Sequence, residues 1–312
     1  MREEGSTPSR ALLLSRKLRT AVACWKSSGP RGLAEAALSK LWPVLSPVAY
    51  KSLKMFLRLG YWPNIRNPRT LNEKIVHRQL FAPHPLASRV ADKWRVREYV
   101  AERGLGDILN EVYFVTDDPD KIPFDDLPDR FVIKANHGCA MNYFVTDKQT
   151  LDRQGVIRLS REWLSLKYGK ATRNYETHYD SIRPMVLVER FIGEGHGVPV
   201  DYKFYCFHQA ALLVDVHVGR FANHTANLYD REWRDIGIRS EVPCGEVVPK
   251  PRNLQTMLQI AERLSGDFDF CRVDLYAPDA GRFLFGEITI NPAAGLTRFI
   301  PREWDFRLGE LW

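Results

Sequence analysis

Short apolar runs with a two-residue period dominate the chain from residue 131 onward, and this period is typical of strands. Two of these runs flank His208-Gln209, and two flank Ala277-Pro-Asp-Ala-Gly281, so each pair predicts a hairpin. The strands are expected at 112–115, 131–134, 185–192, 202–207, 211–218, 271–276 and 282–291.

Apolar residues with helical spacing indicate helices between and before these strands. Thr70-Leu-Asn-Glu73 has the form of a capping box, which predicts a helix starting there. A second helix is expected to follow His84-Pro85 and to continue to Gly104. Two more are predicted at about 148–168 and at 254–264. Helices and antiparallel hairpins together predict an α+β protein.

Residues 1–60 differ from the rest of the chain in charge. They hold 11 Lys and Arg against 3 Asp and Glu, whereas the remainder is almost neutral. An apolar stripe over 11–25, with basic residues beside it, predicts an amphipathic helix that either packs on the protein or lies on an anionic membrane. The first 60 residues are therefore a basic helical extension with a candidate peripheral contact to the inner leaflet of the plasma membrane.

The domain prediction has three further parts: a helical or α/β subdomain at 61–130, a small lobe at 131–200 and a C-terminal lobe at 201–312.

The nearly neutral charge of residues 61–312 argues against a nucleic-acid partner. Five cysteines without metal or disulfide spacing favour reduced thiols and a cytoplasmic protein. No apolar run approaches the length of a membrane span.

The final hairpin carries the most informative chemistry. Alternation places Arg272 and Asp274 on one face of the first strand. It places Glu287, Thr289 and Asn291 on one face of the second. Two carboxylates with an amide nearby form an oxygen-rich set suited to Mg²⁺. Glu287 lies in an apolar run, so we expect a buried carboxylate that needs a partner or an ion. Arg272 is suited to hold phosphate oxygens.

Other candidates are less specific. Lys134 ends a buried strand before a loop containing His137 and Gly138, where lysine and backbone amides suit nucleotide phosphates. Asp201 and Lys203 share a face, which indicates either a phosphate-binding wall or a structural ion pair. Arg298 is a candidate clamp for a substrate carboxylate, or a surface arginine. The histidines have no metal spacing, and His217 and His224 are expected in the core or on the surface.

Taken in chain order, several motifs resemble those of the TupA-like ATP-grasp family, which is associated with bacterial surface polysaccharides. The resemblance covers about residue 65 to the end of the chain. The motifs are Asn67-Pro-Arg-Thr-Leu-Asn-Glu-Lys74, Asp92-Lys93, Phe131-Val-Ile-Lys-Ala-Asn-His137, Asp201-Tyr-Lys-Phe-Tyr-Cys-Phe207, Asn223-His224, Arg272-Val-Asp-Leu-Tyr276, Phe285-Gly-Glu-Ile-Thr289 and Glu303-Trp-Asp305.

The resemblance implies an ATP-grasp fold, in which two lobes grip ATP, and it implies roles for individual residues. Lys93 and Lys134 match the lysines that hold ATP phosphates, and Asp274 and Glu287 match the Mg²⁺ ligands. Arg272 matches the arginine that steadies the transferred phosphoryl group. Glu189 and the backbone of Phe191 and Ile192 match the hinge that holds adenine. Glu194 is the implied contact to the ribose. The family pattern Glu-x-Asn has Thr289 at its third position here, so Thr289 or Asn291 completes the metal site.

The implied function is an ATP-dependent ligase that joins a glycan carboxylate to a small-molecule amine through an acyl phosphate, with ATP and Mg²⁺ as cofactors. Three alternatives stay open. Asp267-Phe-Asp269 has the Asp-x-Asp spacing of glycosyltransferases, or is merely the loop before a strand. A kinase that stops at phosphoryl transfer, or a non-catalytic scaffold with the same fold, also fits the sequence.

Overall fold

A computed structural model describes residues 32–193, 199–219, 223–279 and 282–312. The chain forms two compact units, Met1–Asn64 and Ile65–Trp312. In the first unit, 32–41 is helical and α2 (Pro47–Leu59) follows. Ser46 caps α2 by accepting a hydrogen bond from the amide of Ala49 at 3.3 Å. The amphipathic helix expected over 11–25 lies outside the described residues.

None of the helices in the described ranges has both the length and the apolar character needed to cross a membrane.

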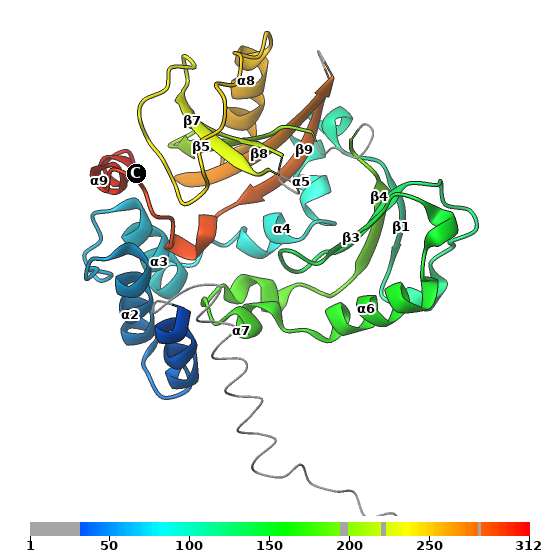
Figure 1. The fold of residues 1–312 in the computed structure, drawn as a ribbon, viewed down its shortest axis with the longest axis horizontal. Helices are drawn as coiled ribbons and strands as arrows, with labels where there is room; N and C mark the ends of the chain where they lie inside the picture. The colour runs from blue at the N-terminus through cyan, green and yellow to red at the C-terminus, as the bar shows by residue number, and fades with distance from the viewer. Residues whose placement is uncertain (1–31, 194–198, 220–222, 280–281) are drawn as a thin grey trace, which may run out of the picture. The chain divides into compact units, whose positions relative to one another are not determined.

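The second unit contains two antiparallel sheets (Figure 1). The smaller has the strand order β1-β4-β2-β3, and the larger has the order β7-β6-β5-β8-β9. The first sheet comprises β1 (Val112–Thr116), β2 (Phe131–Ala135), β3 (Asn142–Val145) and β4 (Val186–Arg190). The second comprises β5 (Asp201–Phe207), β6 (Ala210–Val218), β7 (Thr225–Asp230), β8 (Phe270–Asp279) and β9 (Arg282–Thr289). All the strands predicted from sequence are present.

Helix α6 (Arg153–Ser165) covers one face of the smaller sheet (Figure 1). Val156 and Ile157 of α6 belong to the same buried cluster as Phe131, Ile133 and Val188. Side chains alternate along a strand, so Lys134 and Glu189 point to the opposite face. The helix thus fixes which face of this sheet is left for polar chemistry.

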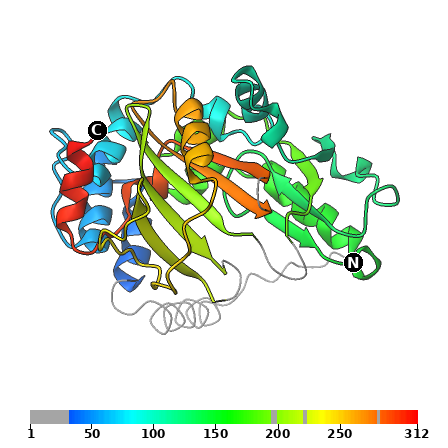
Figure 2. The ribbon, with the colours of Figure 1, turned by 90° about the horizontal axis from the view of Figure 1, so that it is seen from above.

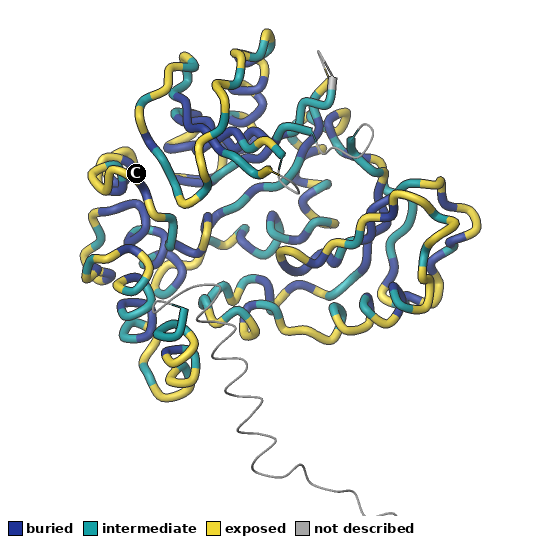
Figure 3. The backbone as a smooth tube through the Cα atoms, viewed as in Figure 1, coloured by how far each residue is buried: buried dark blue, intermediate teal, exposed yellow. Residues whose placement is uncertain are grey.

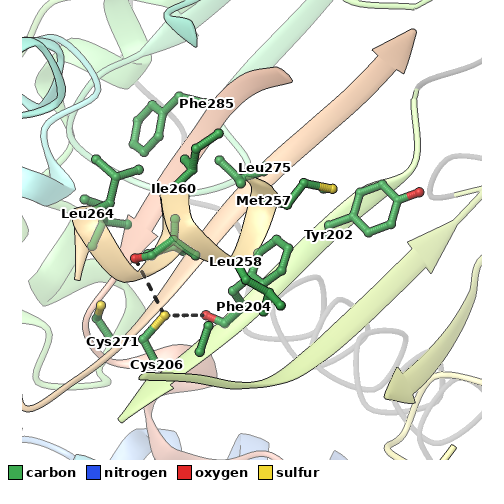
Figure 4. Close-up of a cluster of buried hydrophobic side chains, with 14 of the residues drawn as sticks. Tyr202, Phe204, Cys206, Met257, Leu258, Ile260, Leu264, Cys271, Leu275 and Phe285 are labelled. Carbon is green, nitrogen blue, oxygen red and sulfur yellow. Dashed lines mark hydrogen bonds between the residues drawn. The ribbon is translucent and has the colours of Figure 1, made fainter. Parts of the chain in front are cut away.

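Helix α8 (Leu254–Leu264) covers one face of the larger sheet in the same way (Figures 1 and 2). Figure 4 shows Leu258 and Leu264 of α8 packed on Phe204 and Leu275 from the strands. The thiol of Cys206 lies in this cluster, 3.6 Å from the carbonyl oxygen of Phe204. Buried residues concentrate on β2 and β4 of the smaller sheet and on β5 of the larger one, whereas the edge strand β3 is partly exposed (Figure 3). The opposite face of the larger sheet carries most of its charged residues.

The remaining helices lie around the sheets. The α-helices are α3 (Leu71–Phe81), α4 (Ala87–Ala91), α5 (Val96–Glu102), α7 (Tyr168–Thr172) and α9 (Glu303–Glu310). The 3-10 helices are η1 (Gly106–Ile108), η2 (Pro119–Lys121), η3 (Lys148–Thr150), η4 (Thr177–Ser181) and η5 (Pro292–Gly295). The predicted capping box of α3 is confirmed, because Thr70 accepts from the amide of Glu73 and Glu73 accepts from the amide of Thr70.

Two helix predictions were wrong in extent. The single helix expected from 86 to 104 is divided into α4 and α5, because Asp92 has extended backbone and its carboxylate accepts from the amides of Trp94 and Arg95. The helix expected over 148–168 is the shorter α6, which starts after the N-cap Asp152. The predicted division of the second unit into 61–130, 131–200 and 201–312 stays a prediction.

The buried face of α8 gives a stability prediction. Leu264 is completely buried in the cluster of Figure 4, and Gln259 is exposed on the same helix. Leu264→Ala should lower the free energy of unfolding by about 2–5 kcal/mol, because it leaves a cavity. Gln259→Ala should change it by less than about 0.5 kcal/mol. Urea unfolding followed by tryptophan fluorescence measures both, and equal effects would contradict the assigned packing.

Candidate functional site

The polar face of the larger sheet is organised in rows that run across its strands. One row pairs Asp215 on β6 with Lys203 on β5, Lys203 with Asp274 on β8, and Asp274 with Glu287 on β9. The next row pairs His217 with Asp201. Paired residues on neighbouring strands lie about 5 Å apart, so the row brings charged groups into contact. The sequence predicted that Asp274 and Glu287 lie within a residue or two of each other, and the observed register confirms this.

Arg272 connects the two carboxylates of the final hairpin. Its Nε donates to Asp274 Oδ1 at 2.7 Å, and its Nη2 donates to Asp274 Oδ2 at 2.8 Å and to Glu287 Oε1 at 2.9 Å. Nη2 also lies 3.2 Å from the Thr289 hydroxyl oxygen. Burial alone would lower the pKa of Arg272, but the two carboxylates raise it well above its ordinary value. The guanidinium therefore stays charged and holds both acids in place.

Lys203 extends this network toward the centre of the sheet. Its Nζ lies 2.5 Å from Asp274 Oδ2 and 2.7 Å from Asp201 Oδ2, with all three side chains almost completely buried. Burial would raise the pKa of Asp274, but Arg272 and Lys203 outweigh it and lower the pKa to about 2. Asp201 and Lys203 thus form an ion pair, as one of the two sequence alternatives stated, and this pair is continuous with the predicted metal ligands.

Glu287 is more accessible than its apolar surroundings suggested. Its side chain is 44% exposed, so the expected burial was wrong. Gly286 lies beside the carbonyl of Asp274, and the pairing of β8 with β9 is irregular between Asp274 and Leu275. Glu287 still accepts from Arg272 and from the Thr289 hydroxyl, which donates at 2.7 Å. Both of these bonds use Oε1, so Oε2 takes no part in them.

The oxygen donors beside Arg272 fit a magnesium ion. Asn291 follows β9 as the N-cap of η5; it is 7% exposed, and its Oδ1 has no hydrogen-bond partner among the described residues. Mg²⁺ prefers a few carboxylate oxygens together with water and phosphate. Within the described ranges, no cluster of three or more His, Cys, Asp or Glu forms a ready-made metal site. Asp274, Glu287, Thr289 and Asn291 could supply part of the oxygen set of such an ion, with substrate phosphates and water supplying the rest.

The smaller sheet contributes a second ion pair. Lys134 Nζ lies 2.8 Å from Glu189 Oε2, and the Nδ2 of Asn110 donates to the same oxygen at 3.3 Å. Burial would raise the pKa of Glu189, but Lys134 and Asn110 lower it below its ordinary value, and Arg97 acts in the same direction. The structure thus joins the predicted phosphate lysine and the predicted hinge glutamate in one contact.

Lys93 lies where α4 and α5 separate at Asp92. Its amide donates to the carbonyl of Asn136 at 3.2 Å, and its ammonium group donates to the carbonyl of Gly138. Burial lowers the pKa of Lys93, while Glu287 from one sheet and Glu189 from the other oppose this shift. The broken helix therefore places Lys93 within electrostatic range of the acids of both sheets.

The loop residues predicted beside Lys134 serve the protein itself. The ring of His137 is 1% exposed, and its two nitrogens lie 3.2 Å from Asn136 Oδ1 and 3.0 Å from the carbonyl of Trp163. A side chain at position 138 would collide with Tyr168 and Met141, so Gly138 is required for packing. The prediction that His137 contacts the nucleotide stays a prediction, and both of its ring nitrogens already have partners within the protein.

Only part of the predicted adenine-binding hinge lies within the described residues. The backbone groups of Phe191 and Ile192 form no hydrogen bond within the described ranges, and Glu194 lies outside them. The ring of Phe191 stacks with Arg130, whose guanidinium carbon lies 4.3 Å from the ring centre. An open groove of about 720 Å³ adjoins this ring and contains none of the predicted phosphate or metal residues. Arg298 is exposed in the segment before Phe299.

Three further polar residues lie close together beside the charged row, and the sequence did not predict this. Asp215 and His217 follow each other on the polar face of β6, and His224 precedes β7. His217 Nδ1 lies 2.8 Å from His224 Nε2, and His217 Nε2 lies 3.0 Å from Asp215 Oδ2. The alternation of the correctly predicted hairpin would have placed Asp215 and His217 beside Lys203 and Asp201. Without that register, the sequence places the two histidines only in the core or on the surface.

Comparison with protein families identifies the class. The family described as TupA-like ATPgrasp matches residues 73–312, which include every described residue of the proposed site. The chain belongs to this family, and this membership confirms the resemblance, the ATP-grasp fold with its α+β composition and the predicted enzyme class of ATP-grasp ligases. A search of curated proteins gives no match.

Solved structures with similar folds are distant. The ATP-grasp ligase PsnB, complexed with a minimal precursor, is 13% identical with a TM-score of 0.38, and the match covers 66% of this chain and 55% of that one. The D-alanine–D-alanine ligase from Bacillus anthracis, complexed with ATP, is 14% identical with a TM-score of 0.39 and respective coverages of 71% and 68%. The match thus spans little more than half of the first of these proteins.

The contact between Lys134 and Glu189 gives a prediction about charge. Lys134→Met removes the cation and leaves a buried carboxylate, so the pKa of Glu189 should rise above its ordinary value of 4.5. Lys134→Arg keeps the cation, and the pKa should stay low. Carbon-13 NMR of the glutamate carboxyl groups measures both values. An unchanged pKa in Lys134→Met would contradict the contact.

Proposed function

We propose that the protein is an ATP-dependent, magnesium-requiring ligase that joins a carboxylate of a cell-surface polysaccharide, or of its precursor, to a small-molecule amine. The observation that carries this proposal is the cluster of charged residues on one face of the larger sheet. Four carboxylates at 201, 215, 274 and 287 face two cations, Lys203 and Arg272. A divalent cation would balance this excess of negative charge, and a nucleotide triphosphate commonly brings one.

The two sheets supply different parts of a phosphoryl-transfer site. Lys93 and Lys134 would bind phosphate oxygens from the side of the smaller sheet, and the backbone of Phe191 and Ile192 would hold the adenine. Asp274 and Glu287 would hold Mg²⁺, with Thr289 or Asn291 completing the set. Bound magnesium would neutralise negative charge on the transferring group. Positioning by charged side chains is most of what this chemistry requires.

Arg272 and Lys203 are the cations closest to the proposed metal ligands. In the transfer step, the bond from the terminal phosphorus to its bridging oxygen breaks, and a substrate carboxylate oxygen binds that phosphorus. Arg272 would steady the charge of the phosphoryl group, and Lys203 would keep Asp274 oriented. An amine would then displace phosphate from the activated carboxyl carbon and form the amide. Arg298 is the proposed clamp for the substrate carboxylate.

The partners of the two acids in Asp267-Phe-Asp269 argue against the glycosyltransferase alternative. Asp267 forms an ion pair with Arg103, and Asp269 binds Arg78 at 3.1 Å and the indole nitrogen of Trp312 at 2.7 Å. Both acids of Asp-x-Asp therefore hold parts of the protein together. Comparing thermal shifts with Mg-ATP and with Mn-UDP-sugars separates the two classes. At about 100-fold excess over its dissociation constant, a true ligand stabilises by about 2.7 kcal/mol.

Turnover of ATP tests the proposed metal ligands. Asp274→Asn and Glu287→Gln should each lower the release of ADP from Mg-ATP by about 100-fold or more, because each removes charge that holds the metal and the phosphoryl group. The matched control Asp267→Asn lies on the same segment and should retain most activity. The assay contains uronic acids and amino acids as probes, and ADP release should require both.

If the two ligand variants turned over ATP like the unaltered protein, the metal assignment would be wrong. ADP release without any amine would favour the kinase alternative instead.

We further propose that the protein is cytoplasmic and that residues 1–60 contact the anionic inner leaflet. Each Lys or Arg near such a surface contributes about 1 kcal/mol. The full chain should co-sediment with phosphatidylserine vesicles, and a chain starting at residue 65 should not. Equal sedimentation of both would contradict the contact.

A further inference from the structure

Gln79 on α3 is a buried polar side chain that the protein leaves without a partner. The residue is 8% exposed, and neither its Oε1 nor its Nε2 forms a hydrogen bond within the described ranges. Buried amides are nearly always paired in folded proteins, because an unpaired one loses its hydrogen bonds with water and gains none in return. The position of Gln79 in the fold therefore decides what its amide could bind.

The segment that follows β9 passes over α3. Near the C-terminal end of the helix, the guanidinium of Arg78 donates to the carbonyl of Ile290. Near its N-terminal end, Asn72 Oδ1 accepts from the amide of Thr297 at 3.0 Å. The segment thus crosses α3 from the last turn of the helix to the first, and residues 291–296 lie between these two contacts.

Gln79 lies on the face of α3 that this segment covers. Residues three positions apart in a helix share a face, so Gln79 lies on the same face as Val76. A Cβ added to Gly295 would lie only 2.7 Å from the side chain of Val76, so this face packs directly against the segment. Gln79 is one turn further along the helix, which places its amide beside the part of the segment that begins at Asn291.

Asn291 connects this position with the proposed metal ligands. It follows Thr289 at the two-residue spacing of a strand, so their Cα atoms lie about 7 Å apart. Asn291 is 7% exposed, and its Oδ1 is also unpaired in the part of the chain that the structure describes. Two buried amides with unpaired oxygens, one from α3 and one from the end of β9, therefore adjoin the metal ligands.

The chemistry of these amides suits an uncharged part of a substrate. A carboxamide has no charge and offers an acceptor oxygen and a donor nitrogen. A hydroxyl group or an ether oxygen satisfies it, whereas a buried ammonium or carboxylate group would need an opposite charge. A uronic acid has both kinds of oxygen next to its carboxyl group, because the adjoining carbon carries the ring oxygen and the following carbon carries a hydroxyl.

We propose that Gln79 is a specificity-determining residue that binds the sugar oxygens beside the reacting carboxylate of a uronic acid; this inference rests on the proposed ligase function. The Nε2 of Gln79 donates to the ring oxygen, and its Oε1 accepts from the neighbouring hydroxyl. The Oδ1 of Asn291 accepts from a further hydroxyl of the same sugar. In this arrangement Thr289, rather than Asn291, completes the metal set.

The binding of three carboxylates tests the inference. Two are glucuronate and galacturonate, and the third is cyclohexanecarboxylate, which has a carboxyl group on a ring without any oxygen. Each is titrated by calorimetry into the protein together with Mg²⁺ and a non-hydrolysable ATP analogue. The unaltered protein should bind the better uronate about 10- to 100-fold more tightly than cyclohexanecarboxylate, because the latter leaves the buried amides unpaired.

Gln79→Leu should bring the affinities for the uronate and for cyclohexanecarboxylate within about threefold of each other. The same variant should resist urea as well as the unaltered protein does, or better, because Gln79 has no hydrogen bond to lose. The control Gln259→Leu makes the same exchange at an exposed position of α8 and should keep the selectivity of the unaltered protein.

The contrary results are distinguishable. If Gln79→Leu kept the selectivity, Gln79 would not contact the sugar, and a buried water would account for its amide. If the variant were less stable and bound all three carboxylates equally weakly, the role of Gln79 would be structural.

A parallel assay of ADP release separates this inference from the proposed function. A protein that released ADP with an amine and a carboxylate, but showed no preference for uronates, would be a ligase without the proposed sugar contact. The absence of ADP release with every carboxylate and amine would overturn the ligase function, and the sugar contact with it.

Discussion

The pairing of buried charges around Arg272 is the interaction on which the site depends. Asp274 is 2% exposed, and a lone carboxylate at such a position would be protonated or expelled. Arg272 and Lys203 keep it ionised, and the same arginine holds Glu287 one strand away. Buried ion pairs seldom stabilise a protein more than apolar packing would. A row of them across one face of a sheet is therefore best explained by the chemistry it supports.

The rest of the fold leaves part of this face available. Helix α8 buries one side of the larger sheet, and α6 buries one side of the smaller sheet. On the other side of the larger sheet, α3 and α9 cover the end around Tyr205 and Phe270, and the charged residues collect beyond that end. The interruption at Asp92 then brings Lys93 within range of acids from both sheets. Family membership, the paired cations and the oxygen donors agree with an enzyme that handles a metal-bound triphosphate.

The sequence predicted local features well and contacts between distant segments poorly. The two-residue alternation of apolar side chains predicted where the strands lie. It also predicted that Asp274 lies opposite Glu287, because the short turn of a hairpin restricts the register of its two strands. The exposure of Glu287 depends on the irregular pairing of β8 with β9 beside Gly286. One ring nitrogen of His137 is occupied by the carbonyl of Trp163, which lies on α6, a distant segment of the chain. No local pattern encodes either. The contact of His217 with His224 was missed for the same reason, since it joins a strand to the loop before the next strand. Asp215 and His217 themselves could have been placed beside Lys203 and Asp201 by alternation along the predicted hairpin.

A structure determined with manganese and a non-hydrolysable ATP analogue would test the central claim most directly, because the anomalous scattering of manganese locates the metal without assumptions. The account predicts a peak bonded to carboxylate oxygens of Asp274 and Glu287, with the analogue's phosphates beside Lys93 and Lys134. A metal and nucleotide bound elsewhere, with Arg272 still holding both acids and no ion near them, would contradict it.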